Sequence, residues 1–467
     1  MNGDGRHRGV SGIFPHLCLK AQLGPPRTEC GVGALMPWAD RLWAVTYVSS
    51  KSKSGVGTGL YEIDADLNIT QRPESYVGTY TNRLVHFESN QLFIGPWVID
   101  ADRGVRTVDD LLEVRVCSTT RHLTDPENMV YVLGMEGEFF ELDVHSLEVT
   151  RLFDLVEELE LPPVEAVHYN IPHFKAAHCD YGRVVVANNS YGPPDYEGEV
   201  EVGRLAEWDG ERWAILERRP FVEVAGRIGF GGTIFATGWD RASAILEVFT
   251  EADGQWTRYR LPKASHTFDH MWSTEWPRIR EVGHERFLMD CHGAFYELFT
   301  WAYGNRVWGI RPIAQHLWVL GDFATYRGML VLGSDDASPS GKANPLVGEP
   351  QSNLWFGKTD DLWQFGKPQG WGGPWWKDDV RAGQPSDPYL MTGFDHKVLH
   401  LAHDADRAVA FDVEVDFLGC GDWHTYERFE VPADGYIHHT FPPGFGAHWL
   451  RVTADRDCRA SAYLHYT

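Results

Sequence analysis

GEFFELD, residues 137–143, is the stretch that decides the fold, because versions of it recur along most of the chain. A small or turn residue followed by aromatic and aliphatic residues is typical of a short β-strand that leaves a turn. A degenerate copy, PWVID (96–100), stands where a further copy is due. The other copies are GLYEID (59–64), GRLAEWD (203–209), SAILEVF (243–249), GAFYELF (293–299) and SNLWFGK (352–358).

Each copy belongs to a longer unit. A short apolar run precedes it, beginning at residues 42, 92, 130, 184, 234, 287 and 330, and a stretch rich in Trp or β-forming residues follows it. Such a unit reads as four strands in roughly forty to sixty residues, which is typical of a propeller blade. One blade cannot cover its own faces, so the units must stack around an axis. The sequence therefore predicts an all-β fold with a seven-bladed β-propeller over residues 30–375, and a pair of β-sandwiches is the alternative.

The two ends of the chain depart from this rhythm. Residues 1–29 are expected to form an N-terminal extension. The stretch PQGWGGPWWKDDVRAGQPSDP (368–388) is rich in Gly, Pro and charge, which marks a boundary. Beyond it, alternating apolar and polar residues predict a small C-terminal β-sandwich over 385–467. This module resembles an accessory or oligomerisation domain, so oligomer contacts are expected there.

Composition narrows the classes of partner. The 467 residues carry a formal net charge of −24, which argues against nucleic acid and against an anionic membrane surface. Seven scattered cysteines favour a reducing compartment over a disulfide framework. No apolar run approaches the ~18 residues that span a bilayer. The chain is expected to be soluble, cytoplasmic if its N-terminus is native and periplasmic or secreted otherwise.

Basic residues recur at one position of the repeat. Nine residues before each apolar run stand Gly33, Arg83, Arg121, Lys175, Ala225, Arg278 and Gly321. In a propeller this position is expected at the upper mouth of the central channel. The loops after the second strands reach the same face, and they bring Trp97, Asn188, Asn189 and Trp239, with His173 close to Lys175. In an acidic protein, this predicts a positive funnel for an anion with a stackable ring face. The plain alternative is that the cations pair with nearby acids such as Asp125, Glu275 and Asp322.

Two histidines share another repeat position. His86 and His178 stand six residues before their apolar runs, so both are expected just below the basic ring. Neighbouring positive charge lowers the pKa of histidine, and neutral imidazole can act as a base. GDFATYRG (321–328) adds Asp322 for substrate binding and Tyr326 as a proton donor, although Tyr326 would equally fit the lower turn.

One blade carries residue types that bind zinc. His270, Cys291 and His292 lie on it, together with Asp269 and Asp290. Their spacing matches no compact zinc motif, so ordinary polar loop residues are the plainer interpretation. No cofactor is required, and Zn²⁺ or Ca²⁺ is the metal considered.

The cations, histidines and tryptophans at a propeller mouth resemble the sites of seven-bladed carbohydrate enzymes, the ulvan lyases and the propeller α-L-rhamnosidases. The resemblance is architectural and covers residues 30–375. It implies that Arg83 or Arg278 neutralises a uronate, and that His178 or His86 removes the C5 proton. It also implies that Tyr326 or Tyr169 protonates the departing oxygen. Arg121, Lys175 and the loop residues would bind the acidic oligosaccharide.

Two other functions stay open. A hydrolase, in particular one acting on rhamnose–glucuronate linkages, usually wants two carboxyl groups flanking the bond. The candidates are Asp240, Asp269, Glu275, Asp322 and Asp335. A propeller that only binds glycan or protein is the third possibility.

Overall fold

The computed structural model describes residues 17–20, 30–48, 59–75, 82–162, 172–190, 201–264, 276–283, 285–299, 307, 309–316, 318–335 and 351–467. The chain divides into two compact units. The first comprises residues 1–113 and 318–364, and the second comprises residues 114–317 and 365–467.

In its described part, the first unit holds three antiparallel sheets of four strands. Two are plain meanders, in which each strand pairs with the next along the chain. They are β2 (Cys30–Trp38), β3 (Arg41–Val48), β4 (Leu60–Ile63) and β5 (Ile69–Gln71), then β6 (Arg83–His86), β7 (Gln91–Ile94), β8 (Trp97–Asp100) and β9 (Val105–Thr107). The third joins β26 (Leu320–Tyr326), β27 (Met329–Asp335) and β28 (Gln351–Gly357) to β1 (Leu17–Lys20).

Strand β1 lies within the stretch expected to be an N-terminal extension. It pairs antiparallel with β28, with Leu17 opposite Leu354 and Lys20 opposite Gln351. Leu19 is 1% exposed and joins the apolar core of this unit. Part of residues 1–29 thus completes a sheet whose other strands come from residues 320–357.

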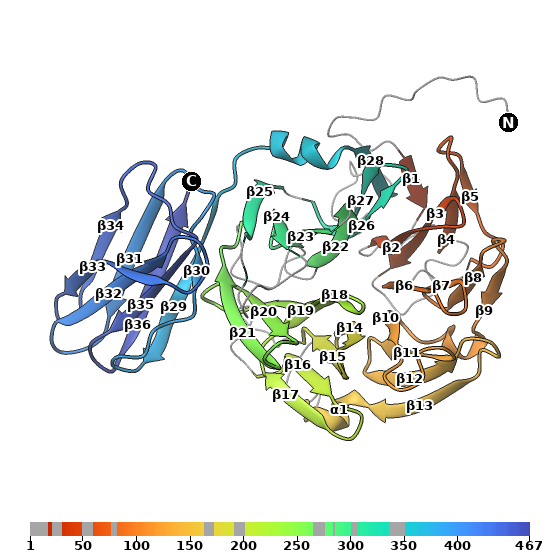
Figure 1. The fold of residues 1–467 in the computed structure, drawn as a ribbon, viewed down its shortest axis with the longest axis horizontal. Helices are drawn as coiled ribbons and strands as arrows, with labels where there is room; N and C mark the ends of the chain where they lie inside the picture. The colour runs from red at the N-terminus through yellow and green to blue at the C-terminus, as the bar shows by residue number, and fades with distance from the viewer. Residues whose placement is uncertain are drawn as a thin grey trace, which may run out of the picture. The chain divides into compact units, whose positions relative to one another are not determined.

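The second unit holds four further meander sheets in its described part, which Figure 1 shows side by side in chain order. Their first strands are neighbours, since β10 contacts β14, β14 contacts β18 and β18 contacts β22. The strands are β10 (Val116–Arg121), β11 (Met129–Gly134), β12 (Glu138–Asp143) and β13 (Val149–Asp154); β14 (Phe174–Asp180), β15 (Arg183–Asn188), β16 (Arg204–Trp208) and β17 (Trp213–Glu217); β18 (Phe221–Arg227), β19 (Phe230–Trp239), β20 (Ala244–Thr250) and β21 (Gln255–Leu261); β22 (Arg278–Gly283), β23 (Arg286–Cys291), β24 (Ala294–Phe299) and β25 (Arg311–Gln315).

The first strand of most sheets carries a bulge near its start. The ladder skips one residue at Gly33, Cys117, Lys175, Val222 and Gly321. A bulge bends a strand and increases its twist. The residue after the bulge ties neighbouring sheets together in two places. Ser118 Oγ accepts a hydrogen bond of 3.1 Å from Ala177 N in the second unit, and Asp322 Oδ2 accepts one of 2.8 Å from Leu35 N in the first.

The all-β prediction is confirmed. Successive four-stranded meanders whose first strands pack together are the blades of a β-propeller. The helical content of the described chain is slight, with α1 (Leu155–Glu158) as its α-helix. No helix among the described residues has the length and apolar character needed to cross a membrane.

The last part of the second unit is a two-sheet module. One sheet contains β29 (Gly370–Val380), β36 (Cys458–Tyr466), β31 (Lys397–His403) and β34 (Tyr436–Thr440). The other contains β30 (Tyr389–Leu390), β35 (Trp449–Ala454), β32 (Val409–Asp416) and β33 (Trp423–Val431). Residues from both sheets form one apolar core. The module includes β29, which begins ahead of the expected start at residue 385.

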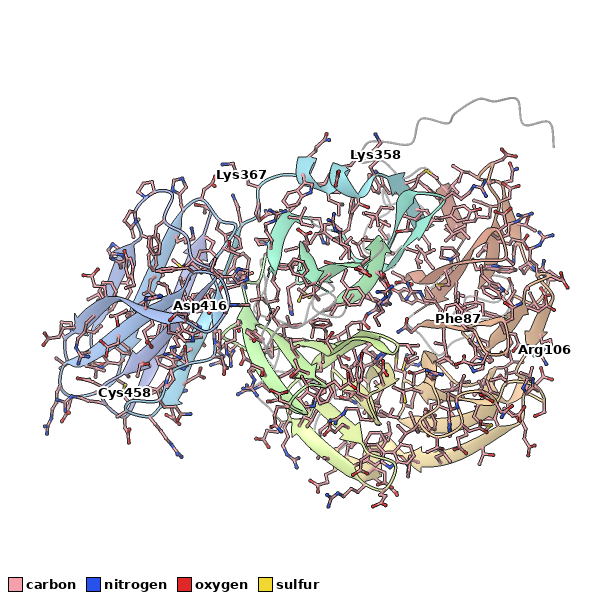
Figure 2. All side chains as sticks on the ribbon, in the orientation of Figure 1. Phe87, Arg106, Lys358, Lys367, Asp416 and Cys458 are labelled. Carbon is pink, nitrogen blue, oxygen red and sulfur yellow. The ribbon has the colours of Figure 1, made fainter. Side chains whose placement is uncertain are left out.

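The module is joined to a blade through backbone pairing. Strand β30 pairs in parallel with β21, with Tyr389 opposite Arg260, so one sheet continues from the blade into the module. Lys263 and Trp371 exchange backbone hydrogen bonds of 2.8 and 2.9 Å. The Tyr259 and Trp449 rings lie 4.9 Å apart between the same two parts. Asp416, labelled in Figure 2, accepts hydrogen bonds from the backbone of residues 418–421.

Candidate functional site

A buried group of charged residues surrounds Trp276 in the second unit. Lys175 Nζ lies 4.9 Å from the centroid of the indole ring, and Arg278 Cζ lies 5.2 Å from it. Lys175 is 4% exposed and Arg278 is 7% exposed. Cations held against an aromatic face and shielded from water are attracted by about 2 kcal/mol. Both cations therefore lie within about 5 Å of one indole ring. Lys175, Glu223, Trp276, Arg278 and Arg280 are called the Trp276 cluster below.

Glu223 is the carboxylate of this cluster. Its Oε2 lies 3.0 Å from Arg280 Nη1 and 3.8 Å from Arg278 Nη1, and the residue is 1% exposed. Within the described chain, Oε1 has no hydrogen-bond partner. Thr237 stands directly opposite Glu223 in the ladder, and its Oγ1 likewise has none. A buried polar atom without a partner costs about 1–3 kcal/mol, so these atoms favour a polar ligand or an ordered water.

The local sequence explains why these side chains meet. Lys175 is the bulged residue of β14, and Glu223 follows the bulged residue of β18. Arg278 opens β22, two residues after Trp276. Because β14, β18 and β22 are consecutive first strands that contact their neighbours, their starting ends lie at one end of the unit.

The loop after β15 lies beside the start of β14. Asn188 faces Phe174 in the ladder, and Asn189 N donates to His173 O at 3.1 Å. Asn188 Oδ1 accepts a hydrogen bond of 2.7 Å from Ser190 N. Asn188 Nδ2 and Ser190 Oγ are buried without a partner in the described part of the chain. This corner therefore adds two more buried polar atoms near Lys175.

His178 lies three residues beyond Lys175 on the same strand. It is 9% exposed, and its Nε2 has no hydrogen-bond partner among the residues that the structure describes. A Cβ atom at Gly226 would lie 2.6 Å from Nε2, so the ring packs against the bare backbone of β18. Burial lowers the pKa of His178, although nearby Asp180 opposes the shift. The imidazole is therefore neutral near pH 7.

Arg83 and Asp322 lie in the first unit and stabilise the fold. Arg83 Nε donates to Leu35 O at 2.7 Å and lies 3.2 Å from Asp322 Oδ2. Asp322 is fully buried and also accepts from Leu35 N. Arg83 therefore pairs with a nearby acid, Asp322, which was the alternative to a role in a positive funnel.

His86 and Tyr326 occupy hairpin ends rather than a mouth. His86 ends β6, with its Nδ1 2.7 Å from Ser89 Oγ in the following turn. Tyr326 ends β26 at its hairpin, and its hydroxyl lies 3.3 Å from Asp40 O. The placement of His86 at the register of His178 is wrong, because His178 precedes its hairpin by two residues.

Three more predicted positions are corrected. Arg121 ends β10 at the hairpin, level with Cys179 and Asp180, so it lies at the opposite end from Lys175. Trp97 is fully buried in an apolar cluster, and its Nε1 donates to Glu74 O at 3.2 Å. Trp239 is also fully buried, with its ring edge-on to His292 at 5.8 Å. Neither indole offers an exposed face for stacking.

Asp240, a carboxyl candidate, and Asp290, which was grouped with the zinc candidates, have different surroundings. Asp240 is buried and bonded twice by Arg260 Nη1, at 3.0 and 2.9 Å. Burial opposes ionisation, but the Arg260 guanidinium holds the pKa of Asp240 below its usual range. Asp290 stands opposite Arg278 in the ladder and lies 2.9 Å from His316 Nε2. Asp240 is thus a structural ion-pair partner, whereas Asp290 borders the Trp276 cluster. Tyr169, Asp269 and Glu275 lie outside the described residues, as does the side chain of Asp335.

The zinc candidates do not meet as a metal site in the described chain. Cys291 belongs to an apolar core, and burial raises the pKa of its thiol far above the usual value. His292 follows it in the turn between β23 and β24 and is fully buried. His270 is outside the described residues. No group of three His, Cys, Asp or Glu among the described residues has the geometry to hold a metal.

Comparison with known proteins gives no family. No family model matches the chain, and no curated protein does. Solved structures do resemble it. One is the β-propeller domain of Cps50 (Swd1) from Myceliophteria thermophila, with a TM-score of 0.38 and 11% identity, over 73% of this chain and 99% of that one. Another is exo-β-1,3-galactanase from Phanerochaete chrysosporium with galactose, with a TM-score of 0.27 and 9% identity, over 73% and 93%. Similarity at this level carries no information on activity.

The position nine residues before each apolar run predicted Lys175 and Arg278 as site residues. It did not identify Trp276, Glu223 or Arg280. A signal for Glu223 was present, since it is the charged residue within the otherwise apolar run FVEVAG (221–226). Trp276 precedes its strand, so no strand pattern marks it.

Proposed function

We propose that the protein binds an acidic, uronate-containing oligosaccharide at the Trp276 cluster and cleaves it by β-elimination. The observation that carries this proposal is the convergence of Lys175 and Arg278 on the Trp276 ring, at 4.9 and 5.2 Å. Two cations at low exposure attract a carboxylate strongly, because little water screens them.

Elimination needs the same cations. Removing the proton at C5 spreads negative charge onto the uronate carboxylate, and fixed positive charge beside that group lowers the barrier. The C5–H electron pair forms the new C4–C5 double bond while the C4–O bond breaks. Glu223 keeps Arg278 and Arg280 oriented, since it contacts both guanidinium groups.

His178 is the proposed base. It is neutral because burial lowers its pKa, and its Nε2 has no hydrogen-bond partner among the described residues. A general base must be unprotonated before it accepts a proton, and a neutral imidazole meets this requirement at neutral pH. Tyr169 is the remaining proposed proton donor, and no cofactor is needed for this chemistry.

Hydrolysis is the second candidate. It is favoured by two buried carboxyl groups next to Arg278, namely Glu223 at 3.8 Å and Asp290 opposite Arg278 in the ladder. Two carboxyl groups at one bond are the usual requirement of a glycosidase.

The test combines two readouts on a panel of glucuronate-containing oligosaccharides. Ultraviolet absorbance follows unsaturated uronate, and released reducing sugar follows total cleavage. We expect rising absorbance, with kcat/KM about 10²-fold lower in Lys175→Met. His178→Gln should lower kcat more than it raises KM. Arg212→Met is the control, because Arg212 is exposed (85% of its side chain) on another part of the unit. Sugar release without absorbance would establish hydrolysis, and binding without cleavage would establish a glycan-binding propeller.

A further inference from the structure

The outer face of one sheet in the C-terminal module carries a continuous strip of rings. The strip consists of Trp376, Tyr463, His465, His400, Tyr436 and His438, from strands β29, β36, β31 and β34. Neighbouring rings along it have centroids 5.1, 5.8, 5.1, 6.0 and 6.2 Å apart, in that order. It is called the ring strip below.

The strip lies on the outward side of the sheet because the strands alternate, although Tyr463 within it is only 4% exposed. Along β31, Leu399 and Leu401 are buried in the module core, whereas His400 between them is partly exposed. His400 lies opposite His438 on β34 and opposite Tyr463 on β36. Tyr436 is 57% exposed. Crossing four strands gives the strip a length of about 14 Å.

Hydrogen bonds hold the central rings in place. His400 Nδ1 lies 2.8 Å from the Tyr436 hydroxyl, and His400 Nε2 lies 3.2 Å from His465 Nδ1. Apart from the buried Tyr463, the rings therefore present fixed faces together with polar edges. A sugar ring has the matching chemistry, with an apolar C–H face and hydroxyl groups around it.

The charged residues on this face indicate which class of sugar it would bind. Strands β31, β34 and β36 are fully described, and their outward positions carry no Asp or Glu. They carry three histidines and Arg459 instead. On β29, Lys377 lies over Trp376 at 5.7 Å, and Asp379 is opposite Arg459. Asp379 is the carboxylate on the outward side of β29, and Lys377 and Arg459 outnumber it, so in a chain of net charge −24 this face is complementary to an anion.

We propose that the ring strip is a second glycan-binding site, which takes acidic oligosaccharides and binds them more tightly at acidic pH. It is separate from the Trp276 cluster and does not depend on the activity proposed there. Its binding is carried by stacking on Tyr436 and His438 and by protonation of His400 and His465.

The pH direction follows from the histidines. Burial, then His465 and His438, lower the pKa of His400, and burial lowers that of His465. Both are neutral at pH 7.5 and take up protons as the pH falls below the ordinary histidine value of about 6.5. A bound carboxylate favours the protonated forms, so affinity rises as the pH falls.

The test is calorimetric titration of the full chain with trigalacturonate at pH 5.0 and pH 7.5, in the Lys175→Met background that removes the other site. We expect binding at pH 5.0 and at least fivefold weaker binding at pH 7.5. The exposed double substitution Tyr436→Ala and His438→Ala should weaken binding at pH 5.0 at least tenfold. His424→Ala is the matched control, since His424 is 47% exposed on the other sheet.

Three results would overturn the proposal. They are absence of binding at pH 5.0, equal affinity in the Tyr436→Ala and His438→Ala variant, and equal affinity for the neutral trisaccharide xylotriose. Failure of the Trp276 cluster to bind sugar would leave these results unchanged, so the two proposals fail separately.

Discussion

At the scale of single residues, the second unit keeps charge buried by giving each cation a defined neighbour. Lys175 and Arg278 lie against Trp276, and Arg280 is bonded to Glu223. His178 is held differently, by packing against a glycine of the next first strand. Side chains fixed in this way can meet a ligand without reorganising.

Gly226→Ala tests the packing of His178. The new Cβ would meet His178 Nε2 at 2.6 Å and Thr233 O at 3.0 Å, so we expect a loss of about 1–3 kcal/mol in the free energy of unfolding. In a His178→Ala background the same change should cost less, because one of the two clashes is gone. Urea denaturation of the four proteins measures the difference. Equal costs in both backgrounds would show that the ring does not press on β18.

At the scale of elements, the residue after the bulge of a first strand carries much of the sheet-to-sheet connection. Asp322 is the charged example, and Asp322→Ala should destabilise the first unit by about 3 kcal/mol, because it leaves the partly buried Arg83 without its carboxylate and Leu35 N without its acceptor. Ser118→Ala removes two neutral hydrogen bonds between Ser118 Oγ and the backbone of Ala177 in β14 and should cost about 1–2 kcal/mol. Denaturant midpoints compare the two, and an equal cost would contradict the role assigned to Asp322.

The stability of the region where the blade meets the C-terminal module is expected to depend on pH. His448 precedes β35, and burial lowers its pKa to about 4. The folded state therefore binds fewer protons than the unfolded state between pH 4 and pH 6.5, so stability falls as the pH drops through this window. The loss is on the order of 3 kcal/mol. His448→Gln should reduce the difference between denaturation at pH 7.0 and pH 4.5, and an unchanged difference would rule His448 out.

The varying length of the hairpin turns limits how well the positions of the candidate site residues could be predicted from the sequence. The strands and their order follow from the repeat, because apolar runs and turn residues are local signals. The fixed offset of nine residues assumes constant hairpins, yet the turn is two residues (181–182) after β14 and seven (122–128) after β10. This misplaced Arg121, and the four-residue turn 87–90 misplaced His86. Trp276 and Glu223 form a site through contacts between blades, which no single repeat contains.

At the scale of the whole molecule, distant parts of the chain complete shared sheets. Strand β1 adds to β28, and β30 adds to β21. Such pairing ties segments that are far apart in sequence and covers strand edges that would otherwise be open.

Leu19→Ala probes the first of these connections. Leu19 is 1% exposed in the core of the first unit, so its truncation should cost about 2–5 kcal/mol. Hydrogen exchange should then accelerate in β28 more than in β10. Unchanged exchange in β28 would mean that β1 adds no stability to the sheet.

The most direct test of the central claim is the affinity of the intact protein for trigalacturonate at pH 8.0, where His400 and His465 of the ring strip are neutral. The account predicts measurable binding that weakens with added salt and falls at least about tenfold in Lys175→Met. Equal affinity in wild type, Lys175→Met and the control Arg212→Met would contradict the assignment of the Trp276 cluster as the ligand site.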